Sequence, residues 1–176
     1  AVITAKDVDC IYEVPLMFHK EGLDAKIVEL LNIWTRAPQL EAWEALVKKI
    51  KEPANQVTIA IVGKYTDLTE SYKSLNEALV HGGIPSDCRV NLTFVDSETV
   101  DEHSCSAKLL GADGILVPGG FGSRGVEGKI CAARFARENR VPYFGICLGM
   151  QAAVIEFARH AAGIENAHSS EFDPDT

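Results

Sequence analysis

The chain has 176 residues, of which 47% are apolar and 24% are charged, a composition typical of a packed globular domain and unlike that of a disordered segment. Its formal net charge of -8 argues against nucleic acid as a partner, because a surplus of acidic side chains repels a phosphate backbone. No apolar run approaches the roughly 20 residues that cross a bilayer, and no leader-like pattern opens the sequence. We therefore expect a cytoplasmic protein without a membrane partner.

The cysteines are odd in number, widely spaced and never arranged as C-x-x-C. They are Cys10, Cys88, Cys105, Cys131 and Cys147. This pattern argues against both a disulfide framework and a thiolate metal site. We expect reduced thiols and no metal ligands.

The N-terminal third differs in character from the rest of the chain. Residues 1–33 have a mixed pattern and are interpreted as a tail that belongs to another domain. Residues 34–56 are interpreted as a linker, with an amphipathic helix at 40–50 (L-E-A-W-E-A-L-V-K-K-I) followed by K-E-P-A-N.

From residue 57 onward, strand and helix patterns alternate. Strands are expected at 57–62, 90–95, 114–117 and 141–145, and helices after Thr69, around 107–110, at 126–137 and at 148–161. Residues 57–176 are therefore expected to form one α/β domain with a doubly wound, mostly parallel sheet. Ligands of such sheets bind beyond the carboxyl ends of the strands.

The segment 145–149 (G-I-C-L-G) has the form of a nucleophile elbow, directly after one expected strand and before a helix. Two glycines permit a sharp turn from which Cys147 projects, and the helix N-terminus behind it favours a thiolate. A lone cysteine is more often a small buried apolar residue. Here the glycines and the strand-to-helix context favour a nucleophile.

A second glycine-rich turn, 118–122 (P-G-G-F-G), also follows a strand. The backbone N–H groups of Gly120 and Leu148 could together form an oxyanion hole. Residues 120–125 also satisfy G-x-G-x-x-G, but a dinucleotide fingerprint belongs to the first strand-to-helix turn and this turn follows the third strand. Residues 63–66 do not form a Walker A motif, because Tyr65 stands where Ser or Thr is required. We therefore interpret Lys64 as a solvated or substrate-facing loop residue.

No histidine is a convincing base for Cys147. The candidates are His19, His81, His103, His160 and His168. His168 is the nearest to the expected site in sequence, but it reads better as a loop residue. From the pattern alone, Glu171 is either a substrate-binding carboxylate or a solvated charge, and the second is favoured.

Several segments together resemble the glutaminase domain of the CTP synthase family, a class I glutaminase with a flavodoxin-like fold. They are 62–65 (V-G-K-Y), 118–128 (P-G-G-F-G-S-R-G-V-E-G), 132–139 (A-A-R-F-A-R-E-N) and 142–153 (P-Y-F-G-I-C-L-G-M-Q-A-A). Residues 5–16 (A-K-D-V-D-C-I-Y-E-V-P-L) are similar to the end of that family's ATP-dependent amidoligase domain, which the resemblance assigns to 1–33.

The resemblance implies a ligase that makes CTP from UTP, ATP and glutamine, with Mg²⁺ and ATP at a synthetase site and GTP as allosteric activator. It implies that Cys147 attacks glutamine and that a thioester forms. It assigns the oxyanion and glutamine contacts to Gly120, Leu148, Gly149, Met150, Gln151 and Glu171. It places a lid loop at 120–130 and sets Lys6, Asp7 and Val8 beside the ATP adenine. Members of the family form homotetramers.

The family's triad histidine and glutamate lie beyond the position of Glu171. We therefore expect a C-terminally incomplete glutaminase domain that binds no cofactor of its own and is inactive in isolation. Two alternatives remain: another amidotransferase or hydrolase with a cysteine elbow, and a non-catalytic assembly module.

Overall fold

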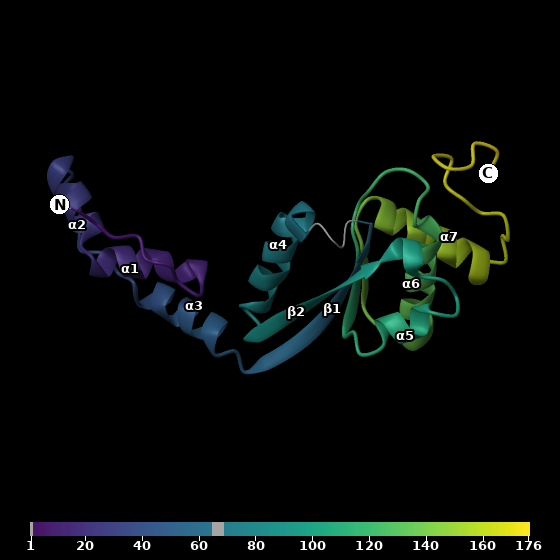
Figure 1. Ribbon diagram of the computed structural model, residues 1–176, viewed down its shortest axis with the longest axis horizontal. Helices are drawn as coiled ribbons and strands as arrows, with labels where there is room; N and C mark the ends of the chain where they lie inside the picture. The colour runs from purple at the N-terminus through teal and green to yellow at the C-terminus, as the bar shows by residue number, and fades with distance from the viewer. Residues whose placement is uncertain (1, 65–68) are drawn as a thin grey trace. The chain divides into compact units, whose positions relative to one another are not determined.

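The computed structural model describes residues 2–64 and 69–176 (Figure 1). These residues form two compact units. The first comprises 1–55 with 83–89, and the second comprises 56–82 with 90–176. The domain boundaries after residues 33 and 56 stay a prediction.

The first unit is built from short helices. A 3-10 helix, η1 (Ile11–Glu13), leads into α1 (Val14–Lys20), followed by α2 (Leu23–Leu30) and α3 (Glu41–Lys51). Gly22 joins α1 to α2 with a positive φ of 78°, a conformation that glycine adopts without a steric penalty. The Nε1 of Trp43, on α3, donates a hydrogen bond to the carbonyl of Tyr12 at 2.6 Å, which ties α3 to η1. The helix predicted at 40–50 is confirmed as α3, whereas the mixed pattern before it gave no prediction of α1 and α2.

The second unit contains the sheet. Its elements, in chain order, are β1 (Asn55–Gly63), η2 (Thr69–Tyr72), α4 (Lys73–Gly83), β2 (Cys88–Asp96), η3 (Ser97–Thr99), α5 (Cys105–Leu109), β3 (Gly114–Val117), α6 (Val126–Asn139), β4 (Tyr143–Gly145) and α7 (Leu148–His160). The strand order is β2-β1-β3-β4. β3 pairs in parallel with both β1 and β4, and Val117 lies opposite Gly145. The loops that leave β3 and β4 therefore start side by side.

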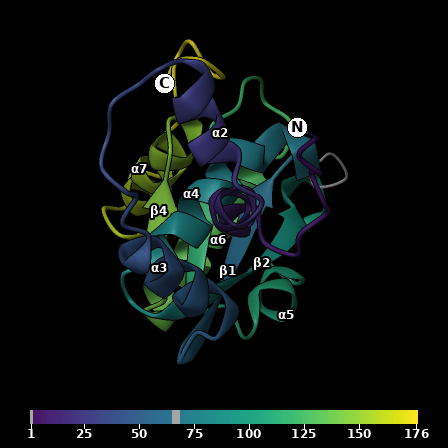
Figure 2. The ribbon, with the colours of Figure 1, turned by 90° about the vertical axis from the view of Figure 1, so that its left-hand side faces the viewer.

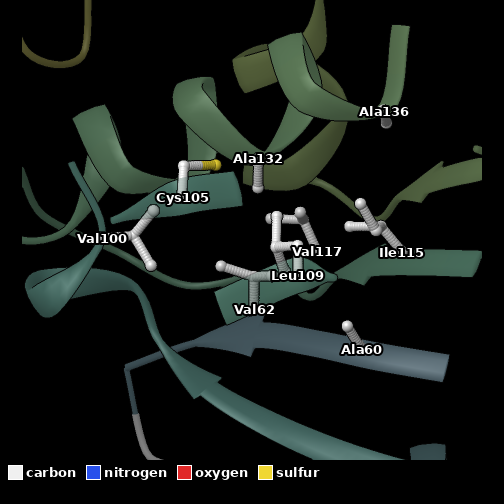
Figure 3. Close-up of a cluster of buried hydrophobic side chains, with 9 residues drawn as sticks. All are labelled: Ala60, Val62, Val100, Cys105, Leu109, Ile115, Val117, Ala132 and Ala136. Atoms are coloured by element: carbon white, nitrogen blue, oxygen red, sulfur yellow. The ribbon is translucent and has the colours of Figure 1, made fainter. Parts of the chain in front are cut away.

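One face of the sheet is covered by α5 and α6 (Figure 3). The buried side chains there, which we call the sheet core, are Ala60, Val62, Val100, Cys105, Leu109, Ile115, Val117, Ala132 and Ala136. Alternate residues of β1 and β3 point to this face because side chains in a strand alternate. In Figure 1 and Figure 2, α4 lies on the other side of β1. Helices on both sides of parallel strands confirm the predicted doubly wound α/β fold.

A second apolar cluster joins α6 to α7. It consists of Val126, Ile130, Leu148, Ala152 and Ile155, with Phe172 packed against it. Arg137 of α6 also makes a bidentate ion pair with the buried carboxylate of Glu156 on α7, with N–O distances of 2.8–3.2 Å. The helix that follows β4 is thereby fixed against the helix that follows β3.

The strand predicted at 141–145 is shorter than expected. The N–H of Val141 donates to the carbonyl of Ala136 and so closes α6, and Pro142 has no N–H to offer a neighbouring strand. β4 therefore begins only at Tyr143. Within residues 2–64 and 69–176, no helix is long and apolar enough to cross a membrane.

Candidate active site

Cys147 lies at the turn between β4 and α7 with φ 52° and ψ -110°. A non-glycine residue at positive φ stores strain, and such strain gathers at functional sites. The side chain is exposed rather than packed in the sheet core. The predicted strained strand-to-helix elbow is therefore confirmed as a conformation.

The two glycines of the elbow are required by close backbone contacts. A Cβ on Gly149 would lie 2.0 Å from the carbonyl oxygen of Val117, and a Cβ on Gly145 would lie 2.4 Å from the carbonyl carbon of Gly149. Both separations are shorter than any side chain tolerates. The phenol of Tyr143 donates a hydrogen bond of 2.7 Å to the Gly149 carbonyl, and burial raises the pKa of this phenol well above its usual range. Tyr143, which our sequence interpretation missed, thus braces the elbow.

The loop after β3 runs directly beside Cys147. A Cβ on Gly119 would lie 3.4 Å from the Cβ of Cys147, and one on Gly120 would lie 4.0 Å from Cδ2 of Leu148. In the described part of the chain, the N–H groups of Gly120 and Leu148 donate to no acceptor. These are the two groups that our sequence interpretation proposed as oxyanion donors, and they are free to bind a ligand.

Lys64 holds this loop from the end of β1. Its Nζ donates to the carbonyl oxygens of Phe121 at 2.6 Å and Gly122 at 3.2 Å. Lys64 therefore holds the loop through hydrogen bonds and is not freely solvated. Tyr65, on which the rejection of a Walker A motif depended, lies outside the described residues.

The loop then enters α6 through a tight contact with η3. Gly125 has φ 70°, and a Cβ there would lie 2.4 Å from the hydroxyl of Ser97. A Cβ on Gly128 would lie 2.0 Å from the Ser97 carbonyl oxygen. The G-V-E-G segment therefore lets the first turn of α6 sit against Ser97, which fixes the start of the helix.

Lys129, one residue further along α6, is buried with a relative exposure of 1%. Burial, followed by the nearby charge of Lys64, lowers the pKa of Lys129 to about 8, while Cys147 acts in the opposite direction. Our sequence interpretation missed this residue. Its spacing from Val126 and Ile130 on the buried side of the helix is the signal that could have found it.

The structure links Gln151 to the C-terminal segment that carries Glu171. The hydroxyl of Ser169 donates to Oε1 of Gln151 at 3.2 Å and accepts a hydrogen bond from the N–H of Glu171 at 3.3 Å. The Glu171 side chain itself is exposed. Met150 is also exposed, on the first turn of α7.

Arg159 fixes that segment to both helices. Its Nη1 pairs with Glu127 of α6 at 3.0 Å, and its Nε donates to the Ala167 carbonyl at 2.7 Å. His168 lies 4.0 Å from the same Glu127 carboxylate, and its ring packs at a tilt of 57° against Phe172 with 5.7 Å between ring centroids. This histidine therefore has structural partners.

The other predicted residues lie in different surroundings. His160 faces Glu156 of its own helix at 3.4 Å, and among the described residues no histidine is hydrogen-bonded to Cys147. Lys6 pairs with Glu21 at 3.4 Å in the first unit, next to Asp7 and Val8. No group of three or more His, Cys, Asp or Glu side chains within residues 2–64 and 69–176 is placed to hold a metal ion.

The geometry combines an exposed thiol on a strained elbow with two free N–H groups beside it, which are two of the parts that acyl transfer uses. The family model for class I glutamine amidotransferases matches residues 67–172. The chain belongs to the class I glutamine amidotransferase family. The elbow, the glycine loop and both helices that support them lie inside the matched range.

Individual relatives agree with the family. The chain is 68% identical over 176 residues to a CTP synthase of Syntrophus aciditrophicus, covering 100% of this chain and 33% of that protein. It is 58% identical to a CTP synthase of Desulfotalea psychrophila, covering 100% of this chain and 32% of that protein. The resemblance drawn from the motifs is thereby confirmed, and the chain spans about a third of the length of these relatives.

A solved structure is similar in fold as well. The CTPS glutaminase domain of Trypanosoma brucei with bound acivicin superposes with a TM-score of 0.62 at 47% identity, covering 68% of this chain and 47% of that chain. This chain therefore shares its fold with a solved glutaminase domain over about two thirds of its length.

Proposed function

We propose that this chain is the glutaminase segment of a CTP synthase, in which Cys147 releases ammonia from glutamine for a synthetase site elsewhere in the longer protein. The observation that carries the proposal is the strained elbow of Cys147, exposed beside the free N–H groups of Gly120 and Leu148. Identity of 68% to a CTP synthase over the whole chain supports the same assignment.

The chemistry follows from the geometry. The thiolate of Cys147 adds to the carbonyl carbon of the glutamine side-chain amide, and the N–H groups of Gly120 and Leu148 bind the oxygen that becomes negative. The tetrahedral adduct collapses, the C–N bond breaks, and the nitrogen leaves as ammonia after taking up a proton. A glutamyl thioester remains, and water hydrolyses it to glutamate. The proton donor is proposed to be a histidine of the longer protein, in keeping with the family resemblance.

The remaining contacts are assigned on the same basis. Gly149, Met150, Gln151 and Glu171 contact bound glutamine, and the link through Ser169 supports a common role for Gln151 and Glu171. Lys6, Asp7 and Val8 border the adenine of ATP. The longer protein binds UTP, ATP and Mg²⁺, and GTP activates it. It assembles as a homotetramer and acts in pyrimidine biosynthesis. Its proposed location is the cytoplasm, where cysteines stay reduced, and this fits the five free thiols.

The test compares two nitrogen sources in the full-length protein. Cys147→Ala should abolish CTP formation from glutamine and leave formation from free ammonia unchanged, because only glutamine hydrolysis uses the thiol. Equal loss with both sources would overturn the assignment of Cys147, and absence of CTP formation from either source by the unaltered protein would overturn the assignment as a CTP synthase.

A further inference from the structure

Lys129 is an anomaly among the buried residues. Its side chain is 1% exposed, yet in the described part of the chain its Nζ has no hydrogen-bond or ion-pair partner. A buried ammonium without a partner is costly, and proteins rarely keep one unless an anion meets it. An anion that approaches Nζ of Lys129 would therefore stabilise its charged form.

The ammonium is aimed at the loop beside the elbow. A Cβ on Gly120 would lie 3.5 Å from Nζ of Lys129, whereas one on the preceding Gly119 would lie 3.4 Å from the Cβ of Cys147. Adjacent residues of one loop thus border the ammonium and the nucleophile. The first turn of α6 holds Lys129 in this position because Gly128 is packed against Ser97.

Two titratable groups act on Lys129 in the described residues. Lys64, at the end of β1, disfavours the charged form of Lys129, and Cys147, at the start of α7, favours it. Lys64 already donates to the loop carbonyls, so its charge is partly engaged. The acceptor left for Lys129 is the negative charge that arises at the elbow.

We propose that Lys129 is a positioning residue of the active site, whose buried ammonium acts across the Gly119–Gly120 loop to favour the thiolate of Cys147 and to draw anionic groups toward it. The inference rests on the proposed function only in taking Cys147 as the nucleophile. Because burial holds the pKa of Lys129 near 8, this charge is present at neutral pH and is lost in mildly alkaline solution. The chemical class of ligand that benefits is an anion, such as a carboxylate or the oxyanion of an adduct.

The experiment compares alkylation of Cys147 by iodoacetate, which is an anion, with alkylation by iodoacetamide, which is neutral. Rates are measured in the full-length protein between pH 6.5 and 9.5 by peptide mass spectrometry, which separates Cys147 from the other thiols. Both reagents react with the same thiolate, so the ratio of the two rate constants cancels the thiolate fraction and reports the local charge. A positive charge within several ångströms should raise this ratio by roughly threefold to tenfold.

The unaltered protein should give a high ratio at pH 7 that falls as the pH passes about 8. In Lys129→Met, the ratio of the iodoacetate rate to the iodoacetamide rate should be low and should not fall near pH 8. In Lys129→Arg, this ratio should stay high across the whole pH range, because a guanidinium keeps its proton. Lys64→Met is the matched control, because it removes a neighbouring charge but leaves Lys129 in place. The fall of the rate ratio with rising pH should remain in this variant. Melting temperatures of all variants verify folding.

A ratio that is the same in the unaltered protein and in Lys129→Met, or a fall of the ratio with rising pH that survives in Lys129→Met, would overturn the inference. Neither result depends on glutamine turnover. Failure of this proposal is therefore distinguishable from failure of the glutaminase assignment, which the two nitrogen sources test.

Discussion

The sheet core and the elbow share strand β3 but differ in what their residues do. On the face covered by α5 and α6, Val62, Leu109 and Val117 are apolar and almost fully buried. At the carboxyl ends of β3 and β4, Cys147 is held at positive φ and Lys129 is a buried ammonium without a partner among the described residues. The core therefore supplies stability, and the elbow consumes part of it to hold groups ready for chemistry.

The largest effect is expected where the two regions touch. Gly149→Ala places a Cβ 2.0 Å from the Val117 carbonyl oxygen, which forces α7 away from β3. The free energy of unfolding should fall by about 4 kcal/mol, at the upper end for single substitutions. Thermal and urea unfolding measure this change.

Gly82→Ala is the matched control, because nothing lies within 4 Å of a Cβ there and Gly82 belongs to helix α4. This substitution should leave the free energy of unfolding unchanged or raise it by about 0.5–1 kcal/mol. Similar losses for both alanines would show that the elbow is not tightly packed against β3.

A deletion in the sheet core should affect stability but not the chemistry of the elbow. Leu109→Ala removes a side chain that is 1% exposed and should lower the unfolding free energy by about 3 kcal/mol. Under conditions where the variant is folded, the alkylation rate of Cys147 should be unchanged. A large change in that rate would contradict the separation between core and elbow.

Removal of the buried charge should have a smaller effect than either loss, and of the opposite sign. Lys129→Met should raise stability at pH 7 by about 2 kcal/mol, since it removes a buried charge and keeps most of the side-chain volume. The pKa of Lys129 is lowered from 10.5 to about 8 on folding, so between these values the unfolded chain binds more protons than the folded chain. The stability of the unaltered protein should therefore rise through this range, and the advantage of Lys129→Met should shrink.

Unfolding midpoints of both proteins at pH 7 and pH 10 measure this difference. A constant gap at the two pH values, or a loss of stability in Lys129→Met at pH 7, would show that Lys129 is not a destabilising buried charge.

Local sequence patterns predicted the parts of the molecule that depend on local rules. The G-x-C-x-G spacing predicted the strained turn at Cys147, and strand patterns separated by helical ones predicted a parallel sheet. The burial of Lys129 was not predicted, because a lysine in a helix is ordinarily solvated. This burial depends on the contact of Gly128 with Ser97, which lies 31 positions earlier in the chain. Tyr143 was missed because its partner is a backbone carbonyl, and the elbow brings that carbonyl of Gly149 to the phenol.

The proposed role of Cys147 requires a covalent glutamyl thioester on its sulfur. The most direct measurement is to mix the full-length protein with glutamine, quench with acid within the first turnover, and locate the added acyl group by peptide mass spectrometry, with Cys147→Ala as the control. A glutamyl group is expected on the peptide that contains Cys147, and none is expected in the control. A glutamyl group on another cysteine such as Cys131, or ammonia release without any acylated peptide, would contradict it.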